Sequence, residues 1–231
     1  MICRIADLYV KIPPAGGMSP RCVNYLADCD ASPDIIIKEE HYNKEKYPDL
    51  DYESLAYMYS GWAFYRQLLS YDGLMFHSSA VELDGVAYLF SGPSGMGKST
   101  HTRLWQQEFP SARIFNDDKP ALRYIDGVWY AYGTPWCGKD GININTKVPI
   151  GGICFLRQGE ENKIRRLPEI EAAAAIISQT LRRFSTSEGL GVMTNLVESL
   201  VREIPVFELV NKPEPEAAIL SHRAMTSAAK E

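Results

Sequence analysis

Eight consecutive residues, Gly92–Ser99, match the phosphate-binding loop pattern G-x-x-x-x-G-K-[S/T] in full. In such a loop the backbone N–H groups surround phosphate oxygens, and the following helix adds its partial positive charge. Lys98 is expected to contact the β- and γ-phosphates, and the Ser99 hydroxyl to bind Mg²⁺. We therefore predict a site for ATP and Mg²⁺, with nucleotide contacts from Gly92, Ser94, Gly95, Met96, Gly97, Lys98, Ser99 and Thr100.

Two adjacent carboxylates, Asp117 and Asp118, follow the loop along the chain. They come directly after the strand-like run 112–116, so they are expected at a strand end, where both can turn toward one site. A phosphate-loop enzyme needs a carboxylate near Mg²⁺, and transfer to a hydroxyl also uses a carboxylate base. An ordinary Asn-Asp-Asp-Lys-Pro turn is the alternative. The phosphate loop favours the functional interpretation.

The flanking segments predict the elements that position these groups. Residues 86–90 are apolar and predict a strand, and residues 100–107 predict a helix, which is the setting a phosphate loop requires. Without this setting, the motif would be a glycine-rich turn with a surface lysine. The alternation of helix and strand signals along the chain predicts an α/β fold.

Two Asp-Gly dipeptides, at 84–85 and 126–127, predict antiparallel hairpins. The hairpin strands are expected at 74–83 with 86–91, and at 121–125 with 128–132. The strand before the phosphate loop therefore has an antiparallel neighbour, which predicts a mixed sheet. Farther along, strands are expected at 148–156 and 206–210, and helices at 169–182 and 192–204.

Four features occur together in one order: His77 within Phe76-His77-Ser78-Ser79-Ala80, the antiparallel strand pair, the phosphate loop, and Asp117-Asp118. In this combination, residues 73–160 resemble the catalytic domain of HPr kinase/phosphorylase, which shares its nucleotide fold with ATP-dependent phosphoenolpyruvate carboxykinase. Residues 133–139 are more similar to a bacterial side branch of HPr-kinase-related proteins, some of which modify peptides made in biosynthetic clusters. The resemblance implies a P-loop kinase with a phosphoenolpyruvate-carboxykinase-like fold.

The resemblance also implies roles for single residues. Asp117 would be the base that takes the proton from the acceptor hydroxyl, and Asp118 would bind metal with Ser99, although these two roles can be exchanged. His77 aligns with a family active-site histidine on the neighbouring strand, where imidazole can contact transferred phosphate or tune the carboxylates. A hydrogen-bonded histidine packed beside the sheet is the alternative.

Residues 133–139, Gly-Thr-Pro-Trp-Cys-Gly-Lys, predict a shaped loop after the second hairpin. Lys139 is expected near the active site, where it can neutralise charge on the transferred phosphoryl group. Trp136 is expected either under the loop or against substrate, and Cys137 is expected to be unreactive. His101, just after the phosphate loop, is expected on a helix surface, with a position near phosphate as the alternative.

Residues 1–72 are predicted to form a small β-rich N-terminal lobe plus a helix, and residues 73–231 the catalytic domain. Short β-like runs lie at 5–12 and 34–38, separated by a loop rich in Pro and Gly. Residues 51–71 predict a helix with an apolar face made of Leu55, Met58, Trp62, Tyr65 and Leu69.

Composition narrows the class of protein. The chain has 231 residues with 45% hydrophobic content, enough for a substantial core. A net charge of −5 without dense Lys/Arg blocks argues against nucleic acid as a partner. No apolar run approaches the roughly 20 residues that cross a membrane. Five cysteines without C-x-x-C spacing, and a first segment without a signal-peptide layout, favour reduced thiols and a cytoplasmic location.

Together these features predict a kinase that transfers phosphate from ATP, with Mg²⁺, to a hydroxyl acceptor. The acceptor is unidentified: a peptide or protein serine, or a small alcohol. One alternative is a carboxykinase acting on oxaloacetate, and another is a non-catalytic nucleotide-binding regulatory module. An oligomer is compatible with the sequence.

Overall fold

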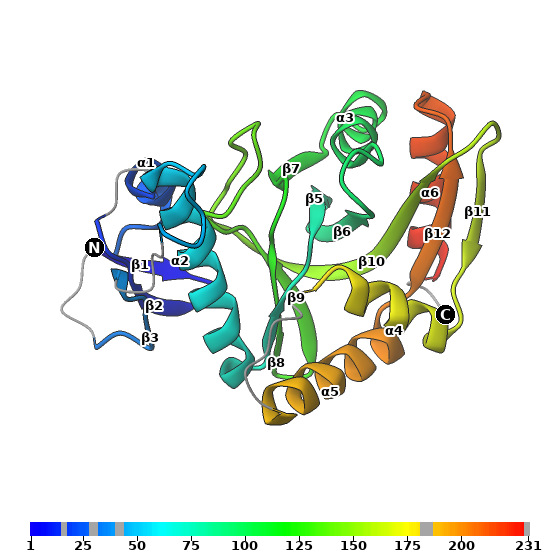
Figure 1. The fold of residues 1–231 in the computed structure, drawn as a ribbon. Helices are drawn as coiled ribbons and strands as arrows, with labels where there is room; N and C mark the ends of the chain where they lie inside the picture. The colour runs from blue at the N-terminus through cyan, green and yellow to red at the C-terminus, as the bar shows by residue number, and fades with distance from the viewer. Residues whose placement is uncertain (15–17, 28–31, 40–43, 181–186, 229–231) are drawn as a thin grey trace.

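A computed structural model shows a mixed α/β chain with a curled mixed sheet (Figure 1). It describes residues 1–14, 18–27, 32–39, 44–180 and 187–228. Within them, no helix is long and apolar enough to cross a membrane.

The N-terminal segment forms a separate three-stranded sheet in the order β1-β2-β3. Strands β1 (Ile2–Ile5) and β2 (Leu8–Lys11) are antiparallel, β3 (Ile35–Ile36) is parallel to β2, and the short helix α1 (Ser19–Cys22) packs beside them. The predicted single run at 5–12 was wrong, because Ala6 and Asp7 adopt φ of 52° and 62° and turn the chain.

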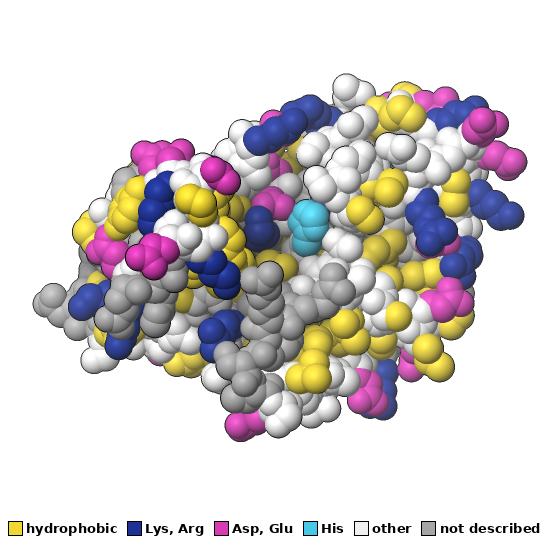
Figure 2. Space-filling view, in the orientation of Figure 1, with side chains coloured by type: hydrophobic (Ala, Val, Ile, Leu, Met, Phe, Trp, Pro, Cys, Tyr) yellow, Lys and Arg dark blue, Asp and Glu magenta, His cyan; other side chains and the backbone are white. Residues whose placement is uncertain are grey.

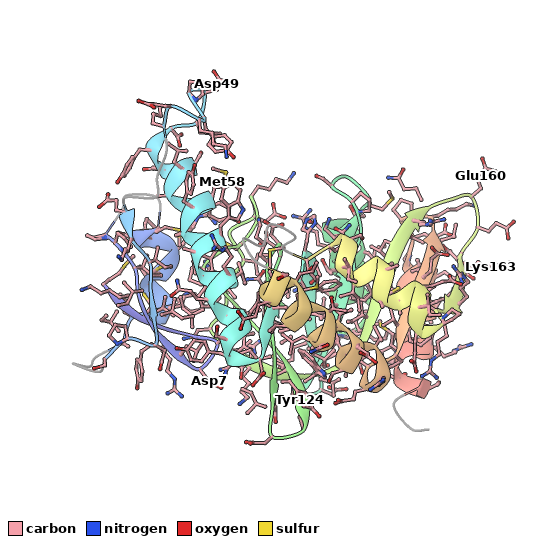
Figure 3. The ribbon with its side chains drawn as sticks, turned by 60° about the horizontal axis from the view of Figure 1, so that its bottom comes forward. Asp7, Asp49, Met58, Tyr124, Glu160 and Lys163 are labelled. Atoms are coloured by element: carbon pink, nitrogen blue, oxygen red, sulfur yellow. The ribbon has the colours of Figure 1, made fainter. Side chains whose placement is uncertain are left out.

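Helix α2 (Tyr52–Leu68) stands between this small sheet and the rest of the chain (Figures 1 and 3). Asp51 caps its start by accepting a hydrogen bond from the Ser54 amide at 2.7 Å. The predicted apolar face was partly wrong, because Met58 and Trp62 are only half-buried. The buried face is centred on small and aromatic residues: Leu55, Ala56, Ser60, Gly61, Phe64, Tyr65 and Leu68.

The large sheet contains nine strands, and its pairing is mixed as predicted. The strands are β4 (Gly73–Met75), β5 (Ser78–Leu83), β6 (Val86–Ser91), β7 (Arg113–Asn116), β8 (Ala121–Ile125), β9 (Val128–Tyr132), β10 (Lys147–Gln158), β11 (Lys163–Arg166) and β12 (Val206–Asn211).

Strand β5 is antiparallel to both β6 and β7, whereas β10 is parallel to both β6 and β12. The two predicted Asp-Gly hairpins are present, since Asp84, Gly85, Asp126 and Gly127 all have positive φ. The expected single strand at 74–83 is split instead. Its first part, β4, leaves β5 and pairs with β8.

Helices cover both faces of the sheet. On one face, α3 (Lys98–Glu108) and α6 (Pro215–Ala228) pack on β6, β10 and β12 through a cluster that includes Trp105 and Met225. On the other face, α4 (Glu169–Ser178) and α5 (Ser187–Glu203) pack through Ile176 and Leu196. Residues 181 and 182, the end of the helix predicted at 169–182, lie outside the described residues.

A third hydrophobic cluster joins the N-terminal segment to the large sheet. It combines residues of β1, β2 and α2 with Ala121, Tyr132 and Trp136. Trp136 is fully buried, stacks on Phe64 with ring centroids 4.7 Å apart, and donates to the Ser60 hydroxyl at 3.0 Å. This packing fixes the loop after β9 against α2.

Close backbone packing around Gly133 gives a first prediction. A Cβ at this position would lie 1.8 Å from the Ile144 carbonyl oxygen, so Gly133→Ala must displace backbone. We expect a loss of about 3 kcal/mol or more in the free energy of unfolding, measured by urea denaturation.

Gly191→Ala is the matched control, because its Cβ would meet nothing within 4 Å in helix α5. It should raise the free energy of unfolding by about 0.5–1 kcal/mol, because alanine favours helix over glycine. A Gly133→Ala protein as stable as the parent would contradict the packing described here.

Candidate active site

The phosphate loop joins β6 to α3, as predicted. Gly92, Gly95 and Gly97 have φ of 145°, 81° and 95°, which L side chains rarely adopt, so the loop's shape depends on glycine. The Lys98 ammonium folds back over the loop and donates to the carbonyl oxygens of Gly92 and Pro93, at 2.8 and 3.2 Å. Burial lowers the pKa of Lys98. The Lys98 side chain therefore lies over the loop.

The loop is open to solvent where a ligand would meet it. Pro93, Ser94, Gly95 and Thr100 are exposed, and Met96, Gly97, Lys98 and Ser99 are half-buried. Behind it, the Thr102 hydroxyl receives a hydrogen bond from Ser79 of β5 at 3.1 Å and donates to the Lys98 carbonyl at 3.2 Å. These bonds tie the start of α3 to the sheet.

Asn116 builds the turn that carries the two carboxylates. Its side-chain oxygen accepts from the backbone N–H of Asp118 and Lys119, at 3.2 and 2.8 Å, and its amide donates to the Thr134 carbonyl at 3.0 Å. Short polar side chains stabilise turns in this way. The Asp118 carbonyl then accepts from the Ser78 N–H at 3.0 Å, which ties the turn to the start of β5.

Asp118 lies in a network of charged and polar groups. Its carboxylate is paired with the Lys119 ammonium, lies 3.3 Å from His77 Nε2, and accepts from the Tyr57 hydroxyl at 3.2 Å. Burial opposes ionisation of this carboxyl, but the His77 and Lys119 contacts outweigh it and lower its pKa to about 2. Asp118 is therefore an anion throughout the physiological range.

Asp117 has the opposite character, although it is the next residue. Only 9% of it is exposed, and burial raises its pKa, partly offset by the N–H of Gly138, which donates to Oδ1 at 2.6 Å. A Cβ at Gly138 would lie 3.0 Å from the other carboxylate oxygen, so glycine allows the close approach. A carboxylate with a raised pKa is the better proton acceptor of the two.

His77 joins this pair to the sheet and to Gln179, the residue that follows α4. Its Nδ1 lies 3.0 Å from the Gln179 side-chain oxygen, while Nε2 faces Asp118. The His77 carbonyl accepts from Ser91, the last residue of β6 before the phosphate loop, at 2.8 Å. The charges of Asp118 and Lys119 both act on Lys98. The structure therefore brings His77, both carboxylates and the phosphate loop to one edge of the sheet.

Three contributors were missed by the sequence analysis: Lys119, Tyr57 and Arg21. The Tyr57 hydroxyl accepts from Lys119 Nζ at 3.0 Å and contacts the Cys137 carbonyl at 3.0 Å, and the Arg21 guanidinium lies 4.9 Å from the Tyr57 ring centroid. Lys119 could have been found, since it follows Asp118 directly. Tyr57 and Arg21 carry no local signal, because they reach the site from α2 and α1.

The loop at 133–139 lies along this edge. Cys137 is buried, and burial raises its pKa, which agrees with the expectation of an unreactive thiol. Lys139 is exposed between Gly138, which binds Asp117, and Asp140, whose carboxylate pairs with Arg103 of α3 at 2.7 Å. Its role in catalysis stays a prediction.

The expectation for His101 was wrong. It is 1% exposed rather than on the helix surface, because it faces α6, where its Nε2 lies 3.0 Å from the Ser221 hydroxyl. Its ring also packs on Phe90 of β6, with centroids 4.6 Å apart.

Among the described residues, two cavities lie beside the phosphate loop. The larger, about 600 Å³, lies on the α4 face and is lined by Gly92, Phe155, Leu167, Ala175 and Gln179, among others. The other, about 480 Å³, lies toward α3 and the ends of β10 and β12. Figure 2 shows a histidine at the middle of the molecular surface, with basic and acidic side chains beside it, between the N-terminal segment and the larger part.

The donor atoms at the edge suit Mg²⁺. This cation usually takes one or two protein oxygens and fills its other positions with phosphate and water. An ionised Asp118 and the Ser99 hydroxyl, next to Lys98, offer donors of that kind. Mg²⁺ bound with the nucleotide would neutralise charge on the β- and γ-phosphates.

The Asp118 network gives a prediction for stability against pH. The folded-state pKa lies below the ordinary value, so the stabilisation is present above about pH 4 and is lost as pH falls through about 2. We expect Asp118→Asn to lower the free energy of unfolding by on the order of 2 kcal/mol near pH 6.

The difference between parent and variant should shrink as the pH is lowered toward 2, as measured by urea denaturation at several pH values. Asp49→Asn, at an exposed position, is the control for removal of a carboxylate. A difference that stays constant between pH 6 and 2.5 would show that Asp118 is not held ionised by its partners.

Comparisons with known proteins give one family. Residues 44–212 match the family model described as SynChlorMet cassette protein ScmC, and none of the curated proteins matches. A solved structure, that of the Hpr(Ser) kinase/phosphatase from Coxiella burnetii, is similar at 10% identity and a TM-score of 0.37, over 66% of this chain and 98% of that one. The specific nucleotide fold stays a prediction. Because the family model covers more than half of its residues, the chain belongs to the ScmC family.

Proposed function

We propose that this chain is a kinase that transfers the γ-phosphoryl group of ATP, with Mg²⁺, to a hydroxyl acceptor. One observation carries the proposal: two adjacent carboxylates with opposite pKa shifts lie at the same sheet edge as a complete phosphate loop. Pairs of acids whose environments separate their pKa values are typical of sites that divide proton transfer from charge stabilisation.

The residues divide the reaction as follows. The loop amides and Lys98 hold the triphosphate, and Ser99 and Asp118 offer the metal ligands. The acceptor oxygen attacks the γ-phosphorus, the bond to the bridging oxygen breaks, and ADP leaves. Asp117 takes the hydroxyl proton, because its raised pKa makes it a better base than Asp118.

Cations near the edge would stabilise the charge that develops on the transferred group. Lys98 lies over the loop, and Lys119 is held between Asp118 and Tyr57. Lys139 is exposed at the end of the loop at 133–139, next to Gly138, which contacts Asp117. From there it can turn toward a phosphoryl group. His77, bonded to Gln179, positions the carboxylate of Asp118.

The acceptor would approach from the side of the N-terminal segment. Tyr57 and Arg21 come from that segment. Both contact the Cys137 carbonyl, at the sheet edge that carries Asp117 and Asp118. The family is described as a cassette protein, so peptides and proteins encoded beside the gene are the first acceptors to test, followed by small alcohols.

Labelled ATP tests the proposal directly. The protein is incubated with Mg²⁺, γ-labelled ATP, the neighbouring gene products and a metabolite pool. We expect label transfer to an acceptor, and a loss of about 100-fold or more in rate for both Lys98→Ala and Asp117→Asn. Lys163→Ala, an exposed lysine on β11 (Figure 3), is the matched control and should retain full activity.

The controls separate the alternatives. Asp117→Asn should still bind ATP, because Asp117 lies outside the loop, whereas Lys98→Ala should bind it weakly. Nucleotide binding without transfer to any acceptor would support a regulatory module instead. Decarboxylation of oxaloacetate would assign the protein to the carboxykinases.

The raised pKa of Asp117 predicts the pH dependence of transfer. A base works only when deprotonated, so the rate should fall as pH drops through this pKa, which burial places above the ordinary aspartate value. The acidic limb of the rate profile is the measurement. If the residual activity of Asp117→Asn keeps the same limb, another group is the base.

A further inference from the structure

The smaller cavity beside the phosphate loop has chemistry that the transfer reaction does not use. Its volume of about 480 Å³ falls within the range of ligand pockets. Gly97, Thr100 and His101 line it from the start of α3, and Gln158, Gly159 and Asn211 line it from the ends of β10 and β12. The turn that follows Gly159 carries Glu160, labelled in Figure 3.

Two lining residues hold buried polar atoms that have no partner among the described residues. These atoms are Nδ1 of His101 and Oδ1 of Asn211. Buried polar atoms are nearly always paired, and leaving one unpaired is costly. Both residues line the same cavity beside the phosphate loop, so a molecule bound there is a source of the missing partners.

The hydrogen-bond partners of the two side chains assign both atoms as acceptors. The Ser221 hydroxyl donates to the Ala218 carbonyl at 3.0 Å and accepts from Trp105 Nε1 at 2.9 Å, so His101 Nε2 is a donor to it. Burial lowers the pKa of His101 to about 4, so the ring is neutral and Nδ1 carries a lone pair. Asn211 uses its amide nitrogen on the Lys212 carbonyl, which leaves Oδ1 free to accept.

The order of the strands places this cavity opposite the carboxylates. The sheet runs β7-β5-β6-β10-β12, with the carboxylates after β7, the phosphate loop after β6, and Gln158 and Asn211 at the ends of β10 and β12. The Gln158 amide also donates to the Gly95 carbonyl of the loop at 3.3 Å. A triphosphate whose γ-group points toward β7 therefore extends its other end toward this cavity.

We propose that this cavity binds the nucleoside of the nucleotide, through sugar hydroxyl or base amino groups that donate to His101 Nδ1 and Asn211 Oδ1. The inference rests on the proposed function, which it extends to the specificity for the nucleoside. The larger cavity on the α4 face is a poorer fit, because none of its described lining residues holds an unpaired buried polar atom.

Asn211 is the residue to test, since His101 also holds α6 through Ser221. Calorimetry compares the affinities of ATP and inorganic tripolyphosphate for the parent, Asn211→Leu and Asn211→Asp. We expect the parent to favour ATP, and Asn211→Leu to reduce the ratio of the two affinities by about five- to tenfold. Asn211→Asp retains an acceptor oxygen and should keep the ratio of the two affinities. Its added negative charge acts on the phosphates of both ligands, so the ratio cancels that general effect.

A ratio unchanged in Asn211→Leu, or equal binding of ATP and tripolyphosphate by the parent, would overturn the nucleoside site and leave the phosphate site intact. Binding of neither molecule would overturn the phosphate site, and the proposal with it.

A second measurement needs no variant. The parent should bind purine riboside triphosphate, which lacks the amino group, or 2′,3′-dideoxy-ATP, which lacks the hydroxyls, about five- to tenfold more weakly than ATP. Equal binding of all three would contradict the proposal.

Discussion

The site depends on one constraint, the antiparallel pairing of β5 with both of its neighbours. Because β5 runs opposite to β6 and β7, its beginning lies beside their ends. His77 before β5, the phosphate loop after β6 and the carboxylates after β7 therefore meet at one edge. In a sheet of βαβ units alone, the start of a neighbouring strand would lie at the far edge. Two hydrogen bonds connect these segments: the Ser91 hydroxyl donates to the His77 carbonyl, and the Ser78 N–H donates to the Asp118 carbonyl.

Two adjacent aspartates acquire different chemistry from what surrounds them. Asp118 is held by His77 and Lys119, which favour its charged form, and it also contacts the Tyr57 hydroxyl. Asp117 is buried against Gly138, where desolvation favours its neutral form. The N-terminal segment takes part in this division, because Tyr57 stands on α2 and the loop that carries Gly138 is fixed by Trp136. A shift of α2 would therefore move groups that contact the Asp117 and Asp118 carboxylates.

Much of this arrangement could be predicted from local signals. The phosphate loop and the Asp-Gly turns depend on positive φ, which only a few residue types accept, so a few letters were enough. Groups that act over long sequence distances left no such trace: Tyr57 contacts Asp118 across 61 positions, and His101 is buried because α6 folds over it across 120. The unanticipated helix α6 is the reason why the surface expectation for His101 failed.

The most direct test is a crystal structure with a non-hydrolysable ATP analogue and Mg²⁺. We expect the γ-phosphate at the β7 edge, Mg²⁺ held by Ser99 and Asp118, and the Asp117 carboxylate facing the γ-phosphorus across the space for an acceptor hydroxyl. A γ-phosphate that points toward β12, with Asp117 turned away from it, would rule out Asp117 as the base.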